Sequence, residues 1–572
     1  MVKEKTIQEK IKDWEVADLP EDLRLEFANS SQSQLEDAFY QDLNFGTAGM
    51  RGLLGVGTNR MNIYTVAQTT EALARHMEKQ GESAKQRGVV ISGDSRINSE
   101  LFKKISAEVL RAHGITVYLF NGPHPTPELS FAVMHLHTYA GIMITASHNS
   151  KEYNGYKLYG EDGGQLPPKP ADEIVRERQE VTDIFHIKKV AGGIKKIGSE
   201  IDKEYLNQVK TIPINRDLIK KWGDKLTISF TPLHGAGGDL GSKALKEAGF
   251  NKILTVKEQF KPDGTFPTVK YPNPEFHEVF KISESYGADV ELAVDPDSDR
   301  MGVGYRTKDG SYNYLTGNQI AALMVNYILT AQQKAGTLPK NGAIVTSIVS
   351  SNLPELIAKS FKVKQFTVLT GFKYIADKIV EFDKKQNYSF EFGFEESYGF
   401  LIKPFVHDKD AIQAITLMSE LAAYYKDRGM TIGDGLDEIH AKFGAFAEET
   451  KATEFPGEKG QEEMTAVMTK FRNRGPKEIG NLKINLVEDN DLRIAKDLNT
   501  GATKKISLPR ANVIKYWLED GSWVALRPSG TEPKLKVYIG AKGENMSSAN
   551  KRLDYLQTEL EKLLKNKNRY QQ

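Results

Sequence analysis

Three segments of the chain repeat one pattern of apolar and polar positions. Each opens on a run of β-branched apolar residues, passes through a polar turn, and continues with apolar residues at helical spacing. Each then ends on a second short apolar run. The segments span residues 89–120, 227–256 and 343–370. This pattern predicts a strand, a helix and a second strand parallel to the first, because parallel strands require a crossover connection.

The distances in sequence between these three segments indicate how the chain divides into domains. Units of this kind occur in every α/β protein, so the pattern alone leaves open whether they are repeats. Their wide separation favours three similar α/β domains with mixed, largely parallel sheets. From about Gly444 the pattern changes to antiparallel strands and a charged helix, which predicts a smaller C-terminal α+β domain. The expected domains are residues 1–204, 205–315, 316–443 and 444–572.

Composition narrows the class of protein. The 572 residues include 77 Lys and Arg against 76 Asp and Glu, a formal net charge of +1. This balance gives no reason to expect nucleic acid or an anionic membrane as a partner. The absence of cysteine excludes disulfides, thiolate catalysis and cysteine zinc sites. With neither a secretion signal nor an apolar membrane span in the sequence, we expect a cytoplasmic, soluble protein.

The stretch ITASHNSKEYNGYKLYG, from Ile144 to Gly160, places Ser147 and His148 directly after an apolar run. Neighbouring residues of an extended segment point to opposite faces, so His148 cannot be assumed to activate Ser147. The stretch alone is compatible both with a nucleophile and with a polar turn after a buried strand.

A second stretch, VELAVDPDSDRMG, ends an apolar strand with Asp295, Asp297 and Asp299 at alternate positions. In a straight strand the first and last would lie roughly 13 Å apart, too far to share one ion. Pro296 favours a bend that lets all three converge on one hard cation. The alternative is an Asp-rich solvated turn, but three clustered carboxylates repel one another without a cation. The sequence therefore predicts a magnesium site.

Three further stretches carry groups suited to a phosphorylated sugar. In ALRPSGTEPKLK, Arg527 offers a planar fork for phosphate, and Ser529, Gly530 and Thr531 can add hydrogen bonds, although these are also ordinary turn residues. EFGFEESYGF supplies carboxylates and a hydroxyl for sugar hydroxyls, although paired glutamates more often form a solvated face. FGTAGMRG places Arg51 in a glycine-rich loop that permits close approach of a phosphate.

Taken together, these motifs resemble the signature of the α-D-phosphohexomutase family, in its bacterial phosphoglucomutase branch. FGTAGMRG, TASHN, DPDSDR, GFEESYGF and RPSGTEPK occur in the family's order and span essentially the whole chain. The resemblance implies three similar α/β domains and a smaller C-terminal domain around a central cleft.

The resemblance also implies a role for each matching position. Ser147 would be the phosphorylated serine, and Asp295, Asp297 and Asp299 would hold Mg²⁺ together with its phosphate. His148 and Lys157 would transfer protons, and Arg51 would stabilise the phosphoserine. The implied substrate-binding residues are Arg300, Thr370, Gly371, Glu395, Ser397, Lys409, Arg527, Ser529, Gly530 and Thr531.

The implied reaction is the reversible conversion of α-D-glucose 1-phosphate to glucose 6-phosphate, with glucose 1,6-bisphosphate as intermediate and activator. Partners would be small-molecule sugar phosphates, and the enzyme would be a monomer or a homodimer. Phosphomannomutase and phosphopentomutase activities of the same family are alternatives. A different class is a magnesium-dependent phosphatase with Asp295 as nucleophile, and a third is a sugar-phosphate sensor without turnover. The sequence does not decide the sugar preference or the dominant acid or base.

Overall fold

The computed structural model describes residues 5–46, 49–455, 460–529 and 534–565. The chain divides into two compact units. The first comprises Met1–Gly317 and Gly371–Thr431, and the second comprises Asn318–Thr370 and Ile432–Gln572. No helix in the described part of the chain is both long and apolar enough to cross a membrane.

A mixed sheet of seven strands forms the first layer of the first unit, in the order β1-β2-β6-β5-β3-β4-β7. The strands are β1 (Phe45–Gly46), β2 (Gly49–Leu53), β3 (Val89–Gly93), β4 (Val117–Phe120), β5 (Ala140–Ile144), β6 (Tyr153–Tyr159) and β7 (Lys195–Ile197). Strands β5, β3, β4 and β7 are parallel, whereas β6 and β2 continue the sheet antiparallel. The first predicted β-α-β segment is confirmed, and its strands are buried on both faces as a parallel sheet requires.

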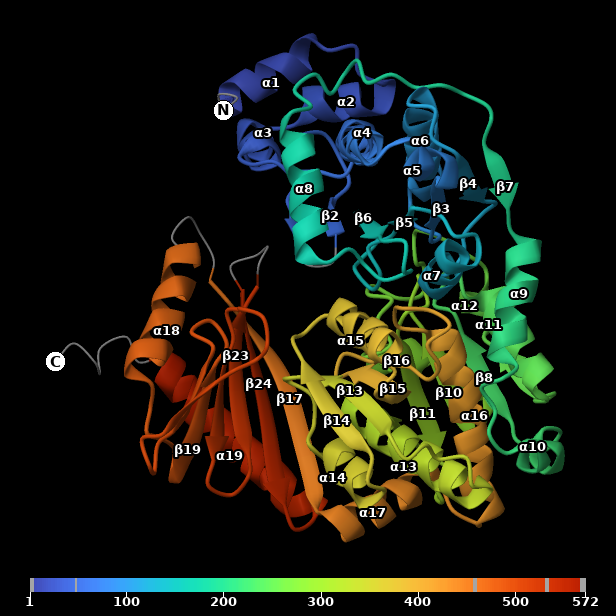
Figure 1. The fold of residues 1–572 in the computed structure, drawn as a ribbon, viewed down its shortest axis with the longest axis vertical. Helices are drawn as coiled ribbons and strands as arrows, with labels where there is room; N and C mark the ends of the chain where they lie inside the picture. Colours follow the sequence, from blue (N-terminus) through green and yellow to red (C-terminus); the bar gives the residue numbers. More distant parts are fainter. Residues whose placement is uncertain (1–4, 47–48, 456–459, 530–533, 566–572) are drawn as a thin grey trace. The chain divides into compact units, whose positions relative to one another are not determined.

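Helices α4, α6 and α7 lie beside this sheet (Figure 1). The helices of this part of the chain are α1 (Ile7–Val16), α2 (Glu21–Asn29), α3 (Gln32–Phe39), α4 (Ile63–Gln80), α5 (Glu82–Arg87), α6 (Ser99–Ala112), α7 (Thr126–His135), α8 (Pro168–Gln179), α9 (Ser199–Val209) and α10 (Arg216–Trp222). Helices α9 and α10 pack on α16 (Ala411–Asp427) instead. Helix α4 packs against α6 and α8, and α6 and α7 pack on β3. The N-terminal helices form a small aromatic core in which the Trp14 ring contacts Phe39 and Tyr64 edge-on.

A second mixed sheet of the first unit has the order β12-β11-β10-β8-β9. Its strands are β8 (Ile228–Thr231), β9 (Ile253–Thr255), β10 (Val290–Val294), β11 (Met301–Arg306) and β12 (Tyr312–Leu315). The helical elements between them are α11 (Gly238–Ala248), α12 (Lys257–Phe260), η1 (His277–Phe280) and η2 (Ser283–Tyr286). Strands β9, β8 and β10 are parallel, which confirms the second predicted β-α-β segment.

The third β-α-β segment belongs to the second unit. It consists of β13 (Gly342–Ser347), α14 (Leu353–Ser360) and β14 (Lys364–Val368), with parallel strands as predicted, and it follows the long helix α13 (Gly317–Ala335). The chain then supplies further elements to the first unit. These are α15 (Phe372–Lys385), the antiparallel pair β15 (Ser389–Glu395) and β16 (Gly399–Leu401), and the buried helix α16 (Ala411–Asp427).

The C-terminal part is an antiparallel sheet in the order β17-β24-β23-β22-β19-β20-β21, with β18 paired to β19. Its strands are β17 (Ala445–Glu454), β18 (Glu478–Ile479), β19 (Leu482–Asp489), β20 (Ile494–Asp497), β21 (Thr503–Lys505), β22 (Ile514–Leu518), β23 (Trp523–Pro528) and β24 (Lys534–Gly543). Helices α18 (Gly460–Arg474) and α19 (Met546–Lys565) pack on this sheet (Figure 1), and α17 (Ile432–Phe443) precedes it. The predicted architecture of α/β domains and a C-terminal α+β domain is confirmed.

Candidate functional site

Ser147 lies in the turn that joins β5 to β6, just beyond the buried end of β5. Its side chain is buried, and its backbone is left-handed, with φ of 54°. The Thr145 hydroxyl accepts a 2.8 Å hydrogen bond from the Ser147 amide and so closes the turn. The Ser147 hydroxyl lies 3.2 Å from His148 Nδ1 and donates a 2.7 Å hydrogen bond to Asp295 Oδ2. The fold therefore joins the serine of the first sheet to the aspartates of the second.

The buried side chain of Arg96 fixes the backbone of this turn. Its guanidinium donates to the carbonyl oxygens of Ser147 at 2.6 Å, Ser150 at 2.8 Å and Tyr153 at 3.0 Å, and also to that of Asn149. One planar cation thus holds four carbonyl groups of the loop, a geometry for which the arginine fork is suited. Sequence reasoning assigned no role to this arginine.

Asp94 supports the same turn through its contacts with Thr145 and Arg96. Its Oδ2 accepts a 2.6 Å hydrogen bond from the Thr145 hydroxyl and lies 3.3 Å from Arg96 Nε, and its Oδ1 accepts from the Ser99 hydroxyl at 3.1 Å. Asp94 and Arg96 follow β3 directly, at the same sheet edge as Ser147. The signal that would have found them is the polar sequence GDSR at the carboxyl end of a parallel strand, where site residues of α/β folds gather.

Asp295, Asp297 and Asp299 occupy the tight turn between β10 and β11, and all three side chains are buried. One carboxylate oxygen of each lies within 4.8 Å of those of the other two. The bend expected at Pro296 is present, and Ser298 completes it in the left-handed region with φ of 54°. Asp295 Oδ1 accepts 3.0 Å hydrogen bonds from the amides of Asp299 and Arg300, which ties the two ends of the turn together.

Three separate segments of the chain donate hydrogen bonds to the backbone of this aspartate turn. The amides of Thr126, Ala236 and Ala411 donate to its carbonyl oxygens at 2.8, 2.8 and 3.1 Å. The Thr126 hydroxyl donates a further 2.9 Å bond to Asp297 Oδ2. Gly235 permits the close approach, because a Cβ at this position would overlap the backbone of Pro296. The turn is therefore positioned before any ligand binds.

Two lysines balance the charge of the aspartates. Lys157 Nζ, on β6, lies 2.8 Å from Asp297 Oδ2 and 3.3 Å from Asp299 Oδ2, and Lys409 Nζ lies 3.1 Å from Asp299 Oδ2. Burial disfavours the charged form of Asp299, but Lys409 and Lys157 outweigh it and hold its pKa well below the usual range. Asp295 pairs with no lysine of the described segments, and burial beside Asp297 and Asp299 raises its pKa well above the usual range.

The three aspartates fit a hard divalent cation. Asp297 Oδ1 and Asp299 Oδ1 are buried and accept no hydrogen bond from any residue that the structure describes. Such unpartnered buried carboxylate oxygens cost free energy unless a ligand satisfies them. The donor set is all oxygen, which suits Mg²⁺, Ca²⁺ or Mn²⁺ better than a softer metal. A buried aspartate triad that can bind a metal is thus present where the sequence predicted it.

Cationic and imidazole side chains surround Ser147 on its other side. Arg51 on β2 donates a 2.7 Å hydrogen bond to Asn149 Oδ1, in the serine turn. Arg300 follows the aspartates and lies 3.6 Å from Glu275 Oε1. Desolvation and the charges of Arg300 and Arg51 hold the pKa of His148 well below its ordinary value. The geometry groups positive charge beside the serine, as an incoming phosphate requires.

The predicted sugar-recognition residues divide between the two units. In the first unit, buried Glu395 ends β15 and its Oε1 accepts a 2.7 Å hydrogen bond from the Gly371 amide, at the start of α15. Ser397 lies in the turn between β15 and β16, and Lys409 lies behind it against Gly399. Thr370 belongs to the second unit.

The predicted phosphate-holding stretch is part of the second unit. Arg527 lies on β23 opposite Lys536 of β24, and the Ser529 amide donates a 2.7 Å hydrogen bond to the Lys534 carbonyl as the hairpin begins. Gly530 and Thr531 lie outside the described residues. The antiparallel strands predicted for this part of the chain are confirmed, whereas the role of the stretch in binding phosphate stays a prediction.

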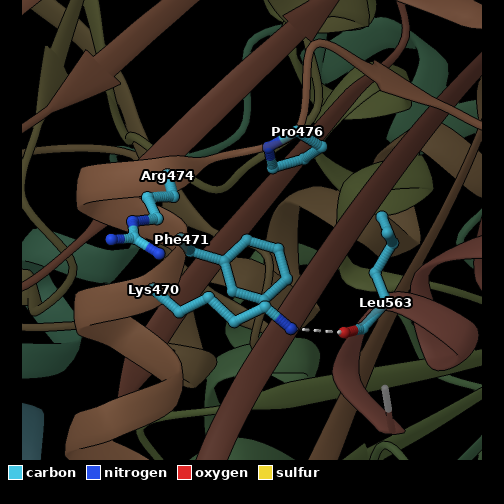
Figure 2. Close-up of a pocket in the computed structure, with 5 residues that line it drawn as sticks. All are labelled: Lys470, Phe471, Arg474, Pro476 and Leu563. Atoms are coloured by element: carbon cyan, nitrogen blue, oxygen red, sulfur yellow. Dashed lines mark hydrogen bonds between the residues drawn. The ribbon is translucent and has the colours of Figure 1, made fainter. Parts of the chain in front are cut away.

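A small pocket of the second unit lies apart from these residues (Figure 2). It is lined by Lys470, Phe471, Arg474, Pro476 and Leu563, between α18 and the end of α19. Lys470 Nζ donates a 3.4 Å hydrogen bond to the Leu563 carbonyl across it. None of the predicted site residues lines this pocket, so it is not part of the candidate site.

Comparison with known families gives matches to four domains in order. They are described as phosphoglucomutase/phosphomannomutase alpha/beta/alpha domains I, II and III and the C-terminal domain. The matched residues are 42–184, 203–308, 316–443 and 481–547. The matches therefore extend over most of the chain.

Individual relatives agree with this result. A phosphoglucomutase of Staphylococcus aureus (strain USA300) is 38% identical over 558 residues, covering 94% of this chain and 98% of its own. The fold resembles a phosphoglucomutase (parafusin) of Paramecium, with TM-score 0.68 and 16% identity over 92% of this chain and 96% of that one. It also resembles a putative phosphomannomutase of Thermus thermophilus, with TM-score 0.66 and 20% identity over 91% and 99%.

Proposed function

Since the chain belongs to the phosphoglucomutase/phosphomannomutase family of enzymes, we propose that it interconverts α-D-glucose 1-phosphate and glucose 6-phosphate. The observation that carries the proposal is the 2.7 Å contact of the Ser147 hydroxyl with one of three buried aspartates. A serine in this place can carry a phosphoryl group whose oxygens would share one cation with the aspartates. The 38% identity to a phosphoglucomutase supports glucose as the sugar.

The proposed reaction consists of two phosphoryl transfers in opposite directions. Phosphorylated Ser147 donates its phosphoryl group to the free hydroxyl of the sugar monophosphate, so the bond from phosphorus to Ser147 Oγ breaks and a bond to the sugar oxygen forms. The bound glucose 1,6-bisphosphate then reorients, and its other phosphoryl group returns to Ser147. A bound Mg²⁺ would supply charge neutralisation for the group in transfer.

The residues around Ser147 have distinct proposed tasks. Asp295, Asp297 and Asp299 would hold Mg²⁺ together with the Ser147 phosphate. The sugar hydroxyl loses its proton to a base and the reverse step needs the conjugate acid, and we assign these transfers to His148 and Lys157. Arg51 would stabilise the phosphate on the serine.

Substrate binding completes the proposal. The hydroxyls of the sugar would be bound by the carboxylate and hydroxyl of the 395–397 turn, and the phosphate that is not being transferred by the 527–531 loop. The residues assigned to the substrate are Arg300, Thr370, Gly371, Glu395, Ser397, Lys409, Arg527, Ser529, Gly530 and Thr531. We assign the chain four domains, residues 1–204, 205–315, 316–443 and 444–572, and a cytoplasmic location as a monomer or homodimer.

The geometry disfavours a phosphatase with Asp295 as nucleophile. Asp295 Oδ1 accepts two backbone amides and Oδ2 accepts the Ser147 hydroxyl, so the hydrogen bonds direct both oxygens at groups of the chain itself. A nucleophilic aspartate needs one oxygen directed at the substrate.

The test is a coupled turnover assay on glucose, mannose and pentose monophosphates, with and without glucose 1,6-bisphosphate, for the wild type and Ser147→Ala. We expect the highest kcat/KM on glucose 1-phosphate, and loss of both turnover and the phosphorylated peptide in Ser147→Ala. Ser150→Ala, in the same loop, is the matched control and should keep both. Higher kcat/KM on mannose or pentose phosphate would reassign the substrate. Phosphate found on Asp295 would establish the phosphatase instead.

A further inference from the structure

A second cluster of metal-ligating side chains lies apart from the aspartate triad, within the first unit. His124 precedes α7, Glu128 lies in the first turn of α7, and Asp202 lies in the first turn of α9. One ligand atom of each lies within 4.8 Å of the other two, and His124 Nε2 is 3.3 Å from Asp202 Oδ1. The loop before α7, the first turn of α7 and the first turn of the distant helix α9 thus direct an imidazole and two carboxylates to one point.

Glu128 is the unusual member of this cluster. Its side chain is fully buried, and neither carboxylate oxygen accepts a hydrogen bond from any described part of the chain. Asp202 Oδ1 is likewise buried and without a hydrogen bond among the described residues. A buried carboxylate is stable only if it is paired, protonated or bound to a metal. Burial, reinforced by the negative charge of Asp202, raises the pKa of Glu128 well above its ordinary value. The cluster therefore presents acceptor atoms that a cation would satisfy.

His124 is oriented as a metal ligand would be. Its Nδ1 lies 3.3 Å from the Gly122 carbonyl oxygen, and its ring packs on Phe120 with centroids 4.5 Å apart. A hydrogen bond from Nδ1–H to a backbone carbonyl, with Nε2 directed at Asp202, is the usual arrangement around metal-bound histidine. Because the ring is held on both sides, its direction does not depend on a bound ion.

We propose that His124, Glu128 and Asp202 bind one divalent transition-metal cation, with Zn²⁺ as the best match. Imidazole nitrogen with two carboxylates suits zinc better than magnesium. Ligands 2.0–2.1 Å from a tetrahedral zinc lie about 3.3 Å apart, and the His124–Asp202 separation is 3.3 Å. The side chains of His124 and Asp202 are 15% and 21% exposed, so the fourth position is open to water.

The position of this site gives the cation a structural task. By binding both Asp202 and Glu128, the cation would connect the first turn of α9 to the first turn of α7. Two residues before Glu128, the Thr126 amide and hydroxyl hold the carbonyl and Oδ2 of Asp297. A cation at the cluster therefore stabilises the turn that positions the aspartate triad, without contacting the reacting groups itself.

The experiment measures the affinity and the stoichiometry of Zn²⁺ binding to the full-length protein. Metal binding at the aspartate triad is weakened by Asp297→Asn, the protein is stripped with a chelator, and Zn²⁺ binding is followed by calorimetry and by elemental analysis after dialysis. We expect one zinc per chain in this background and at least a 10-fold loss of affinity when Glu128→Gln or His124→Gln is added. His135→Gln, at the other end of α7, is the matched control and should retain the zinc. Zinc should also raise the melting temperature of the parent but not of the Glu128→Gln variant.

The competing explanation is a proton shared between Glu128 and Asp202. It requires that Glu128→Gln melt at or above the parent temperature and that zinc shift neither melting curve, and this result would overturn the proposal. Equal zinc affinity in the parent and the Glu128→Gln variant would also overturn it, because the zinc would then lie elsewhere. Should Glu128→Gln fail to fold, the half-buried Asp202→Asn gives the same test and should lose zinc.

Discussion

The Ser147 hydroxyl donates a 2.7 Å hydrogen bond to Asp295 Oδ2 across 148 residues of sequence. This contact joins the turn after β5 of the first mixed sheet to the turn after β10 of the second. Each partner is itself held by backbone hydrogen bonds, Ser147 through the Thr145 hydroxyl and Asp295 through the amides of Asp299 and Arg300. The serine and the carboxylate thus meet in a fixed geometry, and such preorganisation saves reorganisation during the reaction.

Asp297→Asn should weaken divalent-metal binding while leaving the fold intact. The change removes one of three negative charges and leaves an amide that can still accept from Thr126. We expect the Mg²⁺ concentration for half-maximal activity to rise by about 10-fold or more. Changes to residues that only hydrogen-bond to metal ligands already lower metal affinity by about this factor. A magnesium titration of the coupled assay measures it. Asp309→Asn, an exposed carboxylate between β11 and β12, is the control, and equal titration curves for both variants would contradict the metal assignment.

Arg96→Ala should impair turnover by releasing the serine turn. The change removes the group that holds four carbonyl oxygens and leaves Asp94 buried without its ion pair, at a cost of about 3–5 kcal/mol of unfolding free energy. Thermal unfolding and kcat at a temperature where the variant is folded measure the two effects.

Arg178→Ala provides the matched control for this arginine. Arg178 is also buried, but its hydrogen bond goes to the Leu43 carbonyl, away from the serine. The Arg178→Ala variant should have a lower free energy of unfolding than the wild type but a similar kcat. If the two variants lose stability and kcat in the same proportion, Arg96 has no special role in positioning Ser147.

Gly235→Ala should displace the aspartate turn. A Cβ at Gly235 would overlap the backbone of Pro296, which cannot rotate away as a flexible side chain can. Overpacking of this kind costs about 1–3 kcal/mol. We expect a lower melting temperature together with weaker Mg²⁺ activation. At Gly164 a Cβ would make an ordinary 3.5 Å contact with Ala376, so Gly164→Ala should keep both properties.

Glu291→Gln should change the pH dependence of stability. Burial raises the pKa of Glu291 to about 7, against 4.5 in the unfolded chain, although the Ser283 hydroxyl lowers it in part. The folded state therefore prefers the protonated acid. Its contribution is fully present below pH 4.5 and is lost as the pH rises through about 7.

Glutamine cannot ionise, so the stability of the variant relative to the wild type should rise by about 3 kcal/mol between about pH 5 and pH 8. Urea unfolding across this range measures the difference. Glu82→Gln, an exposed glutamate on α5, should give a curve parallel to that of the wild type. A constant difference between Glu291→Gln and the wild type would show that Glu291 does not titrate in this range.

The sequence was sufficient to predict the elements whose signals are local. Apolar runs around polar turns gave the three β-α-β segments, and alternate aspartates after a strand indicated a bend with converging carboxylates. Arg96 and Thr126 could not be found in this way, because their partners lie far along the chain and an arginine or threonine in a turn is ordinary. Gly235 looks in the sequence like any loop glycine, since its reason, the backbone of Pro296, appears only in three dimensions.

The left-handed backbone of Ser147 limits which hydroxyl amino acid can occupy this place. Threonine would offer the same oxygen for phosphorylation, yet its branched Cβ is strongly disfavoured at the φ of 54° that the turn imposes. Moving φ to a relaxed value would rotate the loop carbonyls away from Arg96. Two amino acids that are exchangeable at many phosphorylation sites are therefore not equivalent here, and the constraint comes from the main chain rather than from the chemistry of the oxygen.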